Sequence, residues 1–301
     1  MKLKEFGVLL KETGQSWLDD NAPRLGAALA YYTVFSLAPL LLIAIFIAGL
    51  IFGRGPAQDQ IIGQLQGLVG EEGGKAIRSM LDHATQPGGG LTGSLLSIGM
   101  LLFGSIGLFT ELQDALNLIW GVRPKAGRGI WDIVRDRLLS FTMVLALAFL
   151  LLASLIVSAI LTASADLFGQ WRVGVVGHLV NEVISLVVIT VLFAMIYRFL
   201  PDAKIAWRDV GLGAAITAVL FEVGKFLIGL YLGHSTIGSA YGAAGSLAVL
   251  LVWLYYSGQI FLFGAEFTKV YANRYGSHII PTDNAERIPT TVNGHPRITS
   301  V

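Results

Sequence analysis

The chain has 301 residues, of which 54% are apolar and only 14% are charged. Because a soluble domain carries about 25% charged residues, this balance excludes an ordinary soluble enzyme and favours a membrane protein. The net charge of +1 excludes a broadly basic surface for nucleic acid, and the lack of cysteine excludes disulfide bonds and thiolate metal sites.

Residues 1–26 predict an amphipathic helix at the cytoplasmic membrane interface. The positions that share one face at helical spacing are Phe6, Leu9, Leu10, Thr13 and Trp17. Such a helix serves either as a simple anchor or as a lipid sensor. The segment lacks the apolar core and cleavage site of a secretory signal, so we expect the first transmembrane helix to direct insertion.

Six windows in residues 27–275 are long and apolar enough to cross a bilayer as helices, for which about 20 residues are needed. The predicted spans are about 27–52, 91–120, 138–165, 178–200, 210–233 and 244–272. The predicted fold class is therefore all-α, a polytopic membrane bundle of six transmembrane helices.

The distribution of Lys and Arg predicts the orientation of this bundle, because cytoplasmic connections carry an excess of both. Sixteen of the 21 basic residues fall in the N-terminal segment, the second-to-third and fourth-to-fifth connections, and the C-terminal region. The two cytoplasmic connections contain Arg123, Lys125, Arg128, Arg135, Arg137, Arg198, Lys204 and Arg208. Both termini are therefore predicted to lie in the cytoplasm.

Three segments outside the spans have distinct compositions. The connection 54–90 is predicted to lie on the external side as two short amphipathic helices, where it caps a cavity, binds an envelope partner or acts as a spacer. Segment 234–246 is small and polar, and it is either a tight turn or a re-entrant segment. The tail 276–301 contains three prolines and many Thr, Asn and Ser residues, a composition that predicts cytoplasmic disorder.

An acid and a base lie deep in the fifth span. Lys225 follows Glu222 by three residues on the same helix face, so the two can form an ion pair. Small residues continue this face, and the whole stripe is Gly211, Ala215, Ala218, Glu222, Lys225, Gly229 and Gly233. We expect the stripe to face another helix or a cavity, where the pair is either a substrate or proton-coupling site or a structural ion pair.

Four further polar residues are candidates for a transport path. Gln259 and Glu266 share a face of the sixth span, and Glu266 either joins the path or reaches the headgroups at the cytoplasmic end. Tyr32 and Ser36 share a face of the first span with Pro39, which frees a backbone carbonyl and is expected to kink the helix.

Enzyme signatures are absent from the sequence. The five histidines are scattered without the spacing of metal ligands, and there is neither a Walker-type phosphate loop nor a Gly-x-Ser-x-Gly nucleophile elbow. We therefore predict no catalytic residue, no bound metal and no cofactor.

Four stretches carry a family signature: GAALAYYTVFSLAP (26–39), YRFLPDAK with WRDV (197–210), GSAYGAAGSLAVLL (238–251) and WLYYSGQIFLFGAEF (253–267). Over about residues 5–275 the chain resembles the YihY/BrkB family. The resemblance implies a bacterial inner-membrane protein with six transmembrane helices. Family members have carried the label ribonuclease BN, but the lack of a clustered His and Asp metal site in this sequence argues against that activity.

The leading functional hypothesis is a transporter or flippase-like protein of the bacterial inner membrane, acting on a lipid, lipid-linked or other amphiphilic substrate in envelope biogenesis. The alternative is a non-transporting membrane scaffold for envelope assembly. Both hypotheses take the lipid bilayer as the main partner, exclude nucleic acid, and leave open a homo-oligomer or an envelope partner.

Overall fold

A computed structural model describes residues 3–85, 107–125, 170–234, 244–292 and 295–297. Outside these ranges lie the third predicted span (138–165), residues 91–106 of the second span, and most of segment 234–246. Three predicted cytoplasmic basic residues also lie outside them: Arg128, Arg135 and Arg137.

Helices make up most of the described chain. They are α1 (Leu3–Asp19), α2 (Ala22–Phe52), α3 (Arg54–Thr85), a helix over residues 107–120, α6 (Gln170–Phe199), α7 (Trp207–His234) and α9 (Gly245–Tyr275). Gly53 ends α2 with a φ of 84°, and Gly70 interrupts α3 with a φ of 79°, both in the region that favours glycine. The connection 54–90 thus contains two helical segments, as its apolar spacing predicts.

Three of the described helices are long and apolar enough to cross a membrane. They are Ala22–Leu50 in α2, Trp207–Tyr231 in α7 and Gly245–Tyr275 in α9. α6 adds a shorter apolar stretch, Ser185–Phe199. These helices overlap the predicted first, fifth, sixth and fourth spans, so the described chain is a mostly helical membrane-type structure. The count of six spans remains a prediction.

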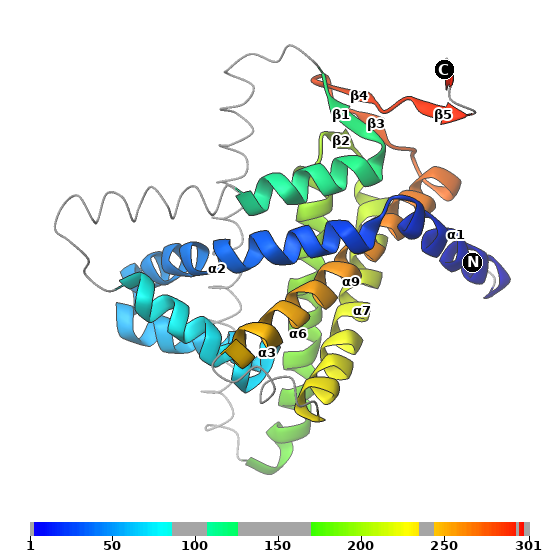
Figure 1. The fold of residues 1–301 in the computed structure, drawn as a ribbon. Coiled ribbons are helices and arrows are strands. Elements are labelled where there is room, and N and C mark those ends of the chain that lie inside the picture. The colour runs from blue at the N-terminus through cyan, green and yellow to red at the C-terminus, as the bar shows by residue number, and fades with distance from the viewer. Residues whose placement is uncertain (1–2, 86–106, 126–169, 235–243, 293–294, 298–301) are drawn as a thin grey trace, which may run out of the picture.

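α9 is the central helix of the described structure, because it contacts α1, α2, α3 and α7. α7 packs in addition against α6, and α2 against α3. In Figure 1, α6 and α7 run alongside each other, α2 and the helix over residues 107–120 cross them, and α9 runs obliquely between. The short strands and the C-terminus lie at the upper right of Figure 1, α1 with the N-terminus lies at the right, and α3 lies on the opposite side, at the lower left.

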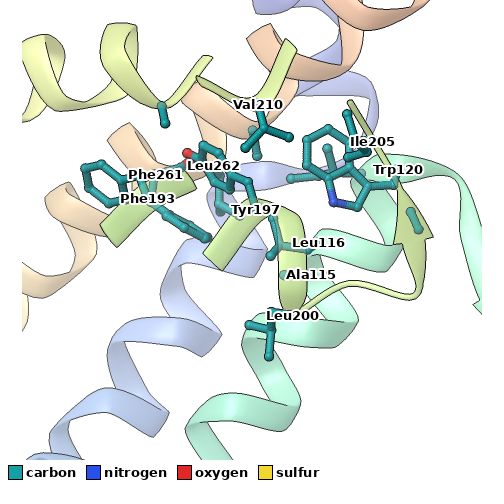
Figure 2. Close-up of a cluster of buried hydrophobic side chains, with 14 of the residues drawn as sticks. Ala115, Leu116, Trp120, Phe193, Tyr197, Leu200, Ile205, Val210, Phe261 and Leu262 are labelled. Carbon is teal, nitrogen blue, oxygen red and sulfur yellow. The ribbon is translucent and has the colours of Figure 1, made fainter. Parts of the chain in front are cut away.

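The larger apolar core lies where the helix over residues 107–120 meets α2, α6, α7 and α9. Its centre is Tyr197, which is fully buried and stacks on Phe193 (centroids 6.2 Å apart), with Phe261 at 5.2 Å and Trp120 edge-on at 6.3 Å. Figure 2 shows these rings converging from three separate helices. The aromatic cluster therefore ties segments that are distant in sequence into one packed unit.

The smaller apolar core attaches α3 to the membrane-type helices. Ile45 on α2, Ile77 on α3 and Leu250 on α9 are each at most 2% exposed and belong to the same cluster. α3 is therefore an integral part of the packed helical structure.

The chain after α9 folds back onto two short connections. β4 (Ala285–Arg287) pairs with β1 (Val122–Pro124), and β3 (Ile280–Pro281) pairs with β2 (Ala203–Lys204), both antiparallel. β5 (Thr290–Val292) pairs with β6 (His295–Arg297). We call residues 276–288 the C-terminal strap.

The disorder predicted for the tail 276–301 is therefore wrong for residues 276–292, which the structure describes. The prediction rested on side-chain composition, whereas the strap is held by the backbone groups that the two connections leave free for pairing. Ion pairs add to this attachment: Lys204 Nζ lies 3.0 Å from Asp283 Oδ1, and Arg123 Nε lies 2.8 Å from Glu286 Oε1.

Candidate functional site

A line of polar side chains lies where α9 meets the turn between α1 and α2. Its members are Gln259, Glu266 and Lys269 on α9, and Asp20 in the turn. We call these four residues the polar seam. Glu266 is fully buried although most of its helix is apolar. The alternative in which Glu266 simply reaches the headgroups does not fit this burial.

One ammonium group in the polar seam serves two carboxylates. Lys269 Nζ lies 2.6 Å from Asp20 Oδ2 and 3.2 Å from Glu266 Oε2. Lys269 and Asp20 keep 23% and 26% of their side chains exposed, whereas Glu266 keeps none. With Asp20 and Glu266 both ionised, the two carboxylates and the Lys269 ammonium would together carry a net charge of −1. Of the two carboxylates, that of Glu266 is shielded from solvent.

Gln259 lies against the first turn of α2. Its Nε2 is 3.5 Å from the carbonyl oxygen of Pro23, and a Cβ atom at Gly26 would come within 2.0 Å of the same nitrogen. Gly258 also abuts Gly26, since a Cβ there would lie 3.6 Å from the Gly26 Cα. Small residues thus let α2 and α9 approach closely at this crossing.

Two buried oxygen atoms of the polar seam have no hydrogen-bond partner among the residues that the structure describes: Oε1 of Gln259 and Oε1 of Glu266. The two residues are seven positions apart, so they share a helix face about 10 Å apart along the axis. An unpaired buried polar atom costs roughly 1–3 kcal/mol. Such atoms in a native fold need an explanation, and a bound ligand, proton or water is a common one.

Glu222 and Lys225 form the ion pair that their spacing predicts. Lys225 Nζ lies 2.5 Å from Glu222 Oε2, and the side chains are 28% and 20% exposed, respectively. Glu222 Oε1 is buried and finds no hydrogen-bond partner in the described ranges. In the part of the chain that the structure describes, no hydrogen bond or ion pair joins these two residues to Gln259 or Glu266. The α7 pair and the polar seam are therefore separate features.

The face of α7 that packs against α9 is not the predicted small-residue stripe. Three residues of α7 contact α9: Gly213, Thr217 and Gly224. Gly213 lies against the Thr268 side chain, and the Thr217 side chain lies against Gly264. Of the described stripe residues, Ala218 is fully buried, whereas Gly229 is exposed. Small residues occur on more than one face of α7, so spacing alone did not identify the contacting face.

Tyr32 and Ser36 occupy a different part of α2. A Cβ at Gly107 would lie 3.2 Å from the Tyr32 ring, so Tyr32 marks the contact between α2 and the helix over residues 107–120. Tyr32 is 39% exposed and Ser36 is 1% exposed. The structure thus brings Gln259 and Glu266 into one seam and leaves Tyr32 at another helix contact.

A second polar network, at the strap, escaped the sequence reasoning. The Asp202 carboxylate accepts hydrogen bonds from Asn117 Nδ2 at 2.9 Å and Gln113 Nε2 at 3.3 Å, and its backbone N–H donates to Asn117 Oδ1 at 2.7 Å. Asp209 Oδ2 accepts from both the backbone N–H and the hydroxyl of Ser277 at 2.9 Å. Asp209 stands in the first turn of α7, where an acid is favoured by the helix dipole, and that position is a signal that sequence reasoning could use. Asp202 lies in the connection between α6 and α7 and carries no such signal.

The described residues of the predicted cytoplasmic connections divide into two groups. Three of them contact the strap: Arg123, Lys125 and Lys204. Lys125 Nζ donates to the carbonyl oxygen of Asp283 at 2.8 Å. Arg198 instead lies over the Trp207 ring, 5.8 Å from its centroid. Neither Arg198 nor Arg208 has a carboxylate partner among the described residues.

The chemistry available to the polar seam is hydrogen bonding and ion pairing. Two carboxylates, one ammonium and one amide can hold a polar headgroup or exchange a proton. Within the described ranges, no group of three or more His, Asp or Glu side chains is placed to hold a metal ion.

Residues 13–289 match the protein family described as Virulence factor BrkB, a range that includes the polar seam and the strap. The chain belongs to this family. The match agrees with the resemblance that residues 26–39 and 253–267 carry in the sequence.

The relatives in this family are called membrane proteins. A UPF0761 membrane protein of Ralstonia nicotianae is 31% identical over 82% of this chain and 55% of its own length. One of Rhodospirillum centenum is 32% identical over 87% of this chain and 56% of its own length, and one of Saccharophagus degradans is 27% identical over 91% and 60%. The chain thus spans little more than half the length of these relatives. No solved structure matches it.

Proposed function

We propose that this BrkB-family membrane protein moves a lipid, a lipid-linked molecule or another amphiphile across the bacterial inner membrane. The observation that carries the proposal is Glu266, a fully buried acid with an unpaired oxygen in a helix long and apolar enough to span a bilayer. Ionisable groups are costly inside a membrane, and they commonly mark substrate or proton pathways.

The rest of the polar seam supports this role. Gln259 offers a second open acceptor oxygen on the same face of α9, and Lys269 offers a cation at the exposed end. A headgroup with hydrogen-bond donors could move along this face while its acyl chains stay against apolar side chains. Glu222 and Lys225 supply another partly exposed polar contact, on a neighbouring helix.

The proposed topology has six transmembrane spans and cytoplasmic termini. It is supported by the gathering of the basic segments at one end of the fold. α1 is tied to the C-terminal part of α9 by Arg274 and Glu12 (2.5 Å), and the strap joins the connections that hold Arg123 and Lys204. All these segments carry the basic residues that the orientation rule assigns to the cytoplasm.

The scaffold hypothesis has less support. It needs free surfaces on α1 and on the connection 54–90, yet Ile61, Ile77 and Leu81 of α3 are buried in the smaller core. Phe6 of α1 makes a ring contact with Phe267 on α9, 6.3 Å between centroids. One face of each of these elements is thus engaged within the chain itself, whereas Val8, Leu10 and Leu18 of α1 remain exposed.

The test is a translocation assay in proteoliposomes that contain fluorescent phosphatidylglycerol or phosphatidylethanolamine, labelled on the headgroup or the acyl chain. Chemical quenching from outside reports the lipid that has crossed. The wild-type protein should accelerate crossing over empty liposomes, and Glu266→Gln should slow it at least tenfold because the buried acid is lost. Glu222→Gln tests the α7 pair in the same assay.

The matched control is Glu71→Gln. Glu71 is 73% exposed on α3, where it pairs with Lys75 one turn away, so its neutralisation should leave the rate unchanged. If the wild-type protein does not accelerate crossing of any of the lipids, transport of membrane lipids is ruled out and the scaffold hypothesis gains. If Glu266→Gln behaves like Glu71→Gln, the polar seam is not the path.

A further inference from the structure

Two arginines at the junction of α6 and α7 stand apart from the ion-pair network of the strap. Arg198 lies in the last turn of α6 and Arg208 is the second residue of α7. The nearest acids in sequence are already engaged: Asp202 by Asn117 and Gln113, and Asp209 by Ser277. Within the described ranges, neither arginine has a carboxylate within ion-pair distance. Two cations thus remain uncompensated at one junction.

Two large exposed aromatic rings lie at this junction, and Arg198 lies over one of them. Trp207 is 54% exposed and Phe199 is 57% exposed, and their rings pack edge-to-face with centroids 5.6 Å apart. The Arg198 guanidinium lies over the Trp207 ring. Neither ring belongs to a buried core. Exposed Trp and Phe beside Arg are typical of the level at which a membrane protein meets lipid headgroups.

An apolar surface extends from this junction along α7. The exposed residues that follow Arg208 on its side of the helix are Leu212, Val219, Val223 and Phe226. Gly211 adds open space, because a Cβ there would meet no described atom within 4 Å. The surface therefore presents cations at one end and roughly four turns of apolar side chains below them, which matches the shape of a phospholipid.

We propose that Arg198, Phe199, Trp207 and Arg208 form a binding site for the phosphate headgroup of an anionic phospholipid. The guanidinium groups pair with the phosphate, for which Arg geometry is well suited. The acyl chains lie along the exposed face of α7. Charge complementarity selects this occupant, since a zwitterionic lipid would leave the two arginines only partly neutralised. The site is independent of the polar seam and does not require transport.

The proposal is tested by measuring lipid binding to the purified full-length protein with native mass spectrometry. Phosphatidylglycerol and phosphatidylcholine of matched chains are titrated separately. Each basic residue beside an anionic surface contributes about 1 kcal/mol, or roughly fivefold, so the Arg198→Gln/Arg208→Gln variant should bind phosphatidylglycerol about twentyfold more weakly. Its phosphatidylcholine binding should not change.

The control variant is Lys4→Gln/Lys11→Gln, which removes the same charge from exposed positions on α1. It should bind phosphatidylglycerol within twofold of the wild type. Equal losses in the two double variants would show a general charge effect and overturn the site, as would equal affinity of the wild type for the two lipids.

A second measurement follows Trp207 fluorescence in protein that keeps both Arg198 and Arg208. Brominated phosphatidylglycerol should quench the fluorescence component that Trp207→Phe removes, and brominated phosphatidylcholine at the same fraction should quench it less. Equal quenching by the two lipids would also overturn the proposal.

Discussion

The Tyr197 side chain lies in the aromatic core (Figure 2), and its hydroxyl is held by two partners. It donates a hydrogen bond to the carbonyl oxygen of Phe261 at 2.7 Å and lies 3.2 Å from Thr217 Oγ1. These contacts join α6 to both α7 and α9. One side chain thus fixes the relative position of three helices.

Replacement of Tyr197 by Phe should lower the free energy of unfolding by about 1–2 kcal/mol. The ring would still fill the core, but the hydrogen bond to Phe261 would be lost and the Thr217 contact would become apolar. Thermal unfolding in detergent would show a reduced Tm with an unchanged helical signal. The control is Tyr31→Phe, whose ring is 58% exposed on α2 and should leave the Tm within error. Equal effects of the two variants would contradict the role of the buried hydroxyl.

For single residues, the sequence predicts which charged side chains pair within one helix better than it predicts how deeply each side chain is buried. The i, i+3 spacing predicts the ion pair of Glu222 with Lys225, because both partners sit on one helix. It does not predict that Glu266 is fully buried while Glu222 is partly exposed, since burial depends on neighbouring helices. For the same reason Asp20, which completes the polar seam from a turn more than 240 positions away in sequence, was not a candidate.

The contact between α7 and α9 consists of two reciprocal pairs of Gly and Thr. Thr217 on α7 donates to the carbonyl oxygen of Gly213 at 2.7 Å, and its side chain covers Gly264 on α9. Thr268 on α9 donates to the carbonyl oxygen of Gly264 at 2.8 Å, and its side chain covers Gly213. Each Thr thereby satisfies its hydroxyl within its own helix and fills the space that a glycine leaves on the other.

Substitution of Gly213 or Gly264 by Ala should separate the two helices. A Cβ at Gly213 would clash with Thr268 Oγ1, and a Cβ at Gly264 would clash with Thr217 Oγ1. Overpacking of this kind costs about 1–3 kcal/mol, and we expect a corresponding fall in Tm in detergent.

A matched control lies on the same helix. Gly229 is exposed with open space around its Cα, so Gly229→Ala should change stability by no more than about 1 kcal/mol. The double variant Gly213→Ala/Thr268→Ala should recover part of the loss because it removes the clashing side chain. A double variant no more stable than Gly213→Ala would argue against this packing.

The sequence predicts where the apolar helices lie, but it does not predict which face of α7 packs against α9. The apolar windows predict α2, α7 and α9 because about 20 apolar residues suffice to define a span. The motif that orients α7 against α9, a small residue followed four positions later by Thr, is present in both helices as Gly213 with Thr217 and Gly264 with Thr268. Small residues at this spacing favour close helix packing, but small residues at the same spacing also occur on the adjacent face of α7 beside Glu222 and Lys225, so the spacing does not distinguish the two faces.

At one end of the molecule, the strap links segments that are far apart in sequence. It joins the connection that follows the helix over residues 107–120 to the connection between α6 and α7, and Asp209 at the start of α7 anchors it through Ser277. No composition rule predicts such pairing, because partner strands of two or three residues carry almost no sequence signal. The excess of Lys and Arg assigns the two connections and the C-terminal region to the same side of the membrane, and that assignment remains a prediction; the strap brings the three segments together at one end of the fold.

The pairing of β1 with β4 can be tested in a chain that contains no native cysteine. Pro124 and Ala285 are directly opposite in the antiparallel register. Lys125 N–H bonds to the Asn284 carbonyl and Ile288 N–H to the Gly121 carbonyl, so the 124–285 pair falls at a non-hydrogen-bonded position. Cα atoms there are about 4.5 Å apart, which lies within the range that a disulfide bridges.

The Pro124→Cys/Ala285→Cys variant should therefore form an intramolecular disulfide in native membranes under mild oxidation, seen as thiols that resist alkylation until reduction. Pro124→Cys/Ile280→Cys is the control, because Ile280 is opposite Lys204 on the other connection and its cysteine should remain alkylated. A disulfide links only groups on the same side of a bilayer. Its formation would therefore place the second-to-third connection and the C-terminal region on the same side of the membrane, and its absence in the first variant would contradict the pairing of β1 with β4.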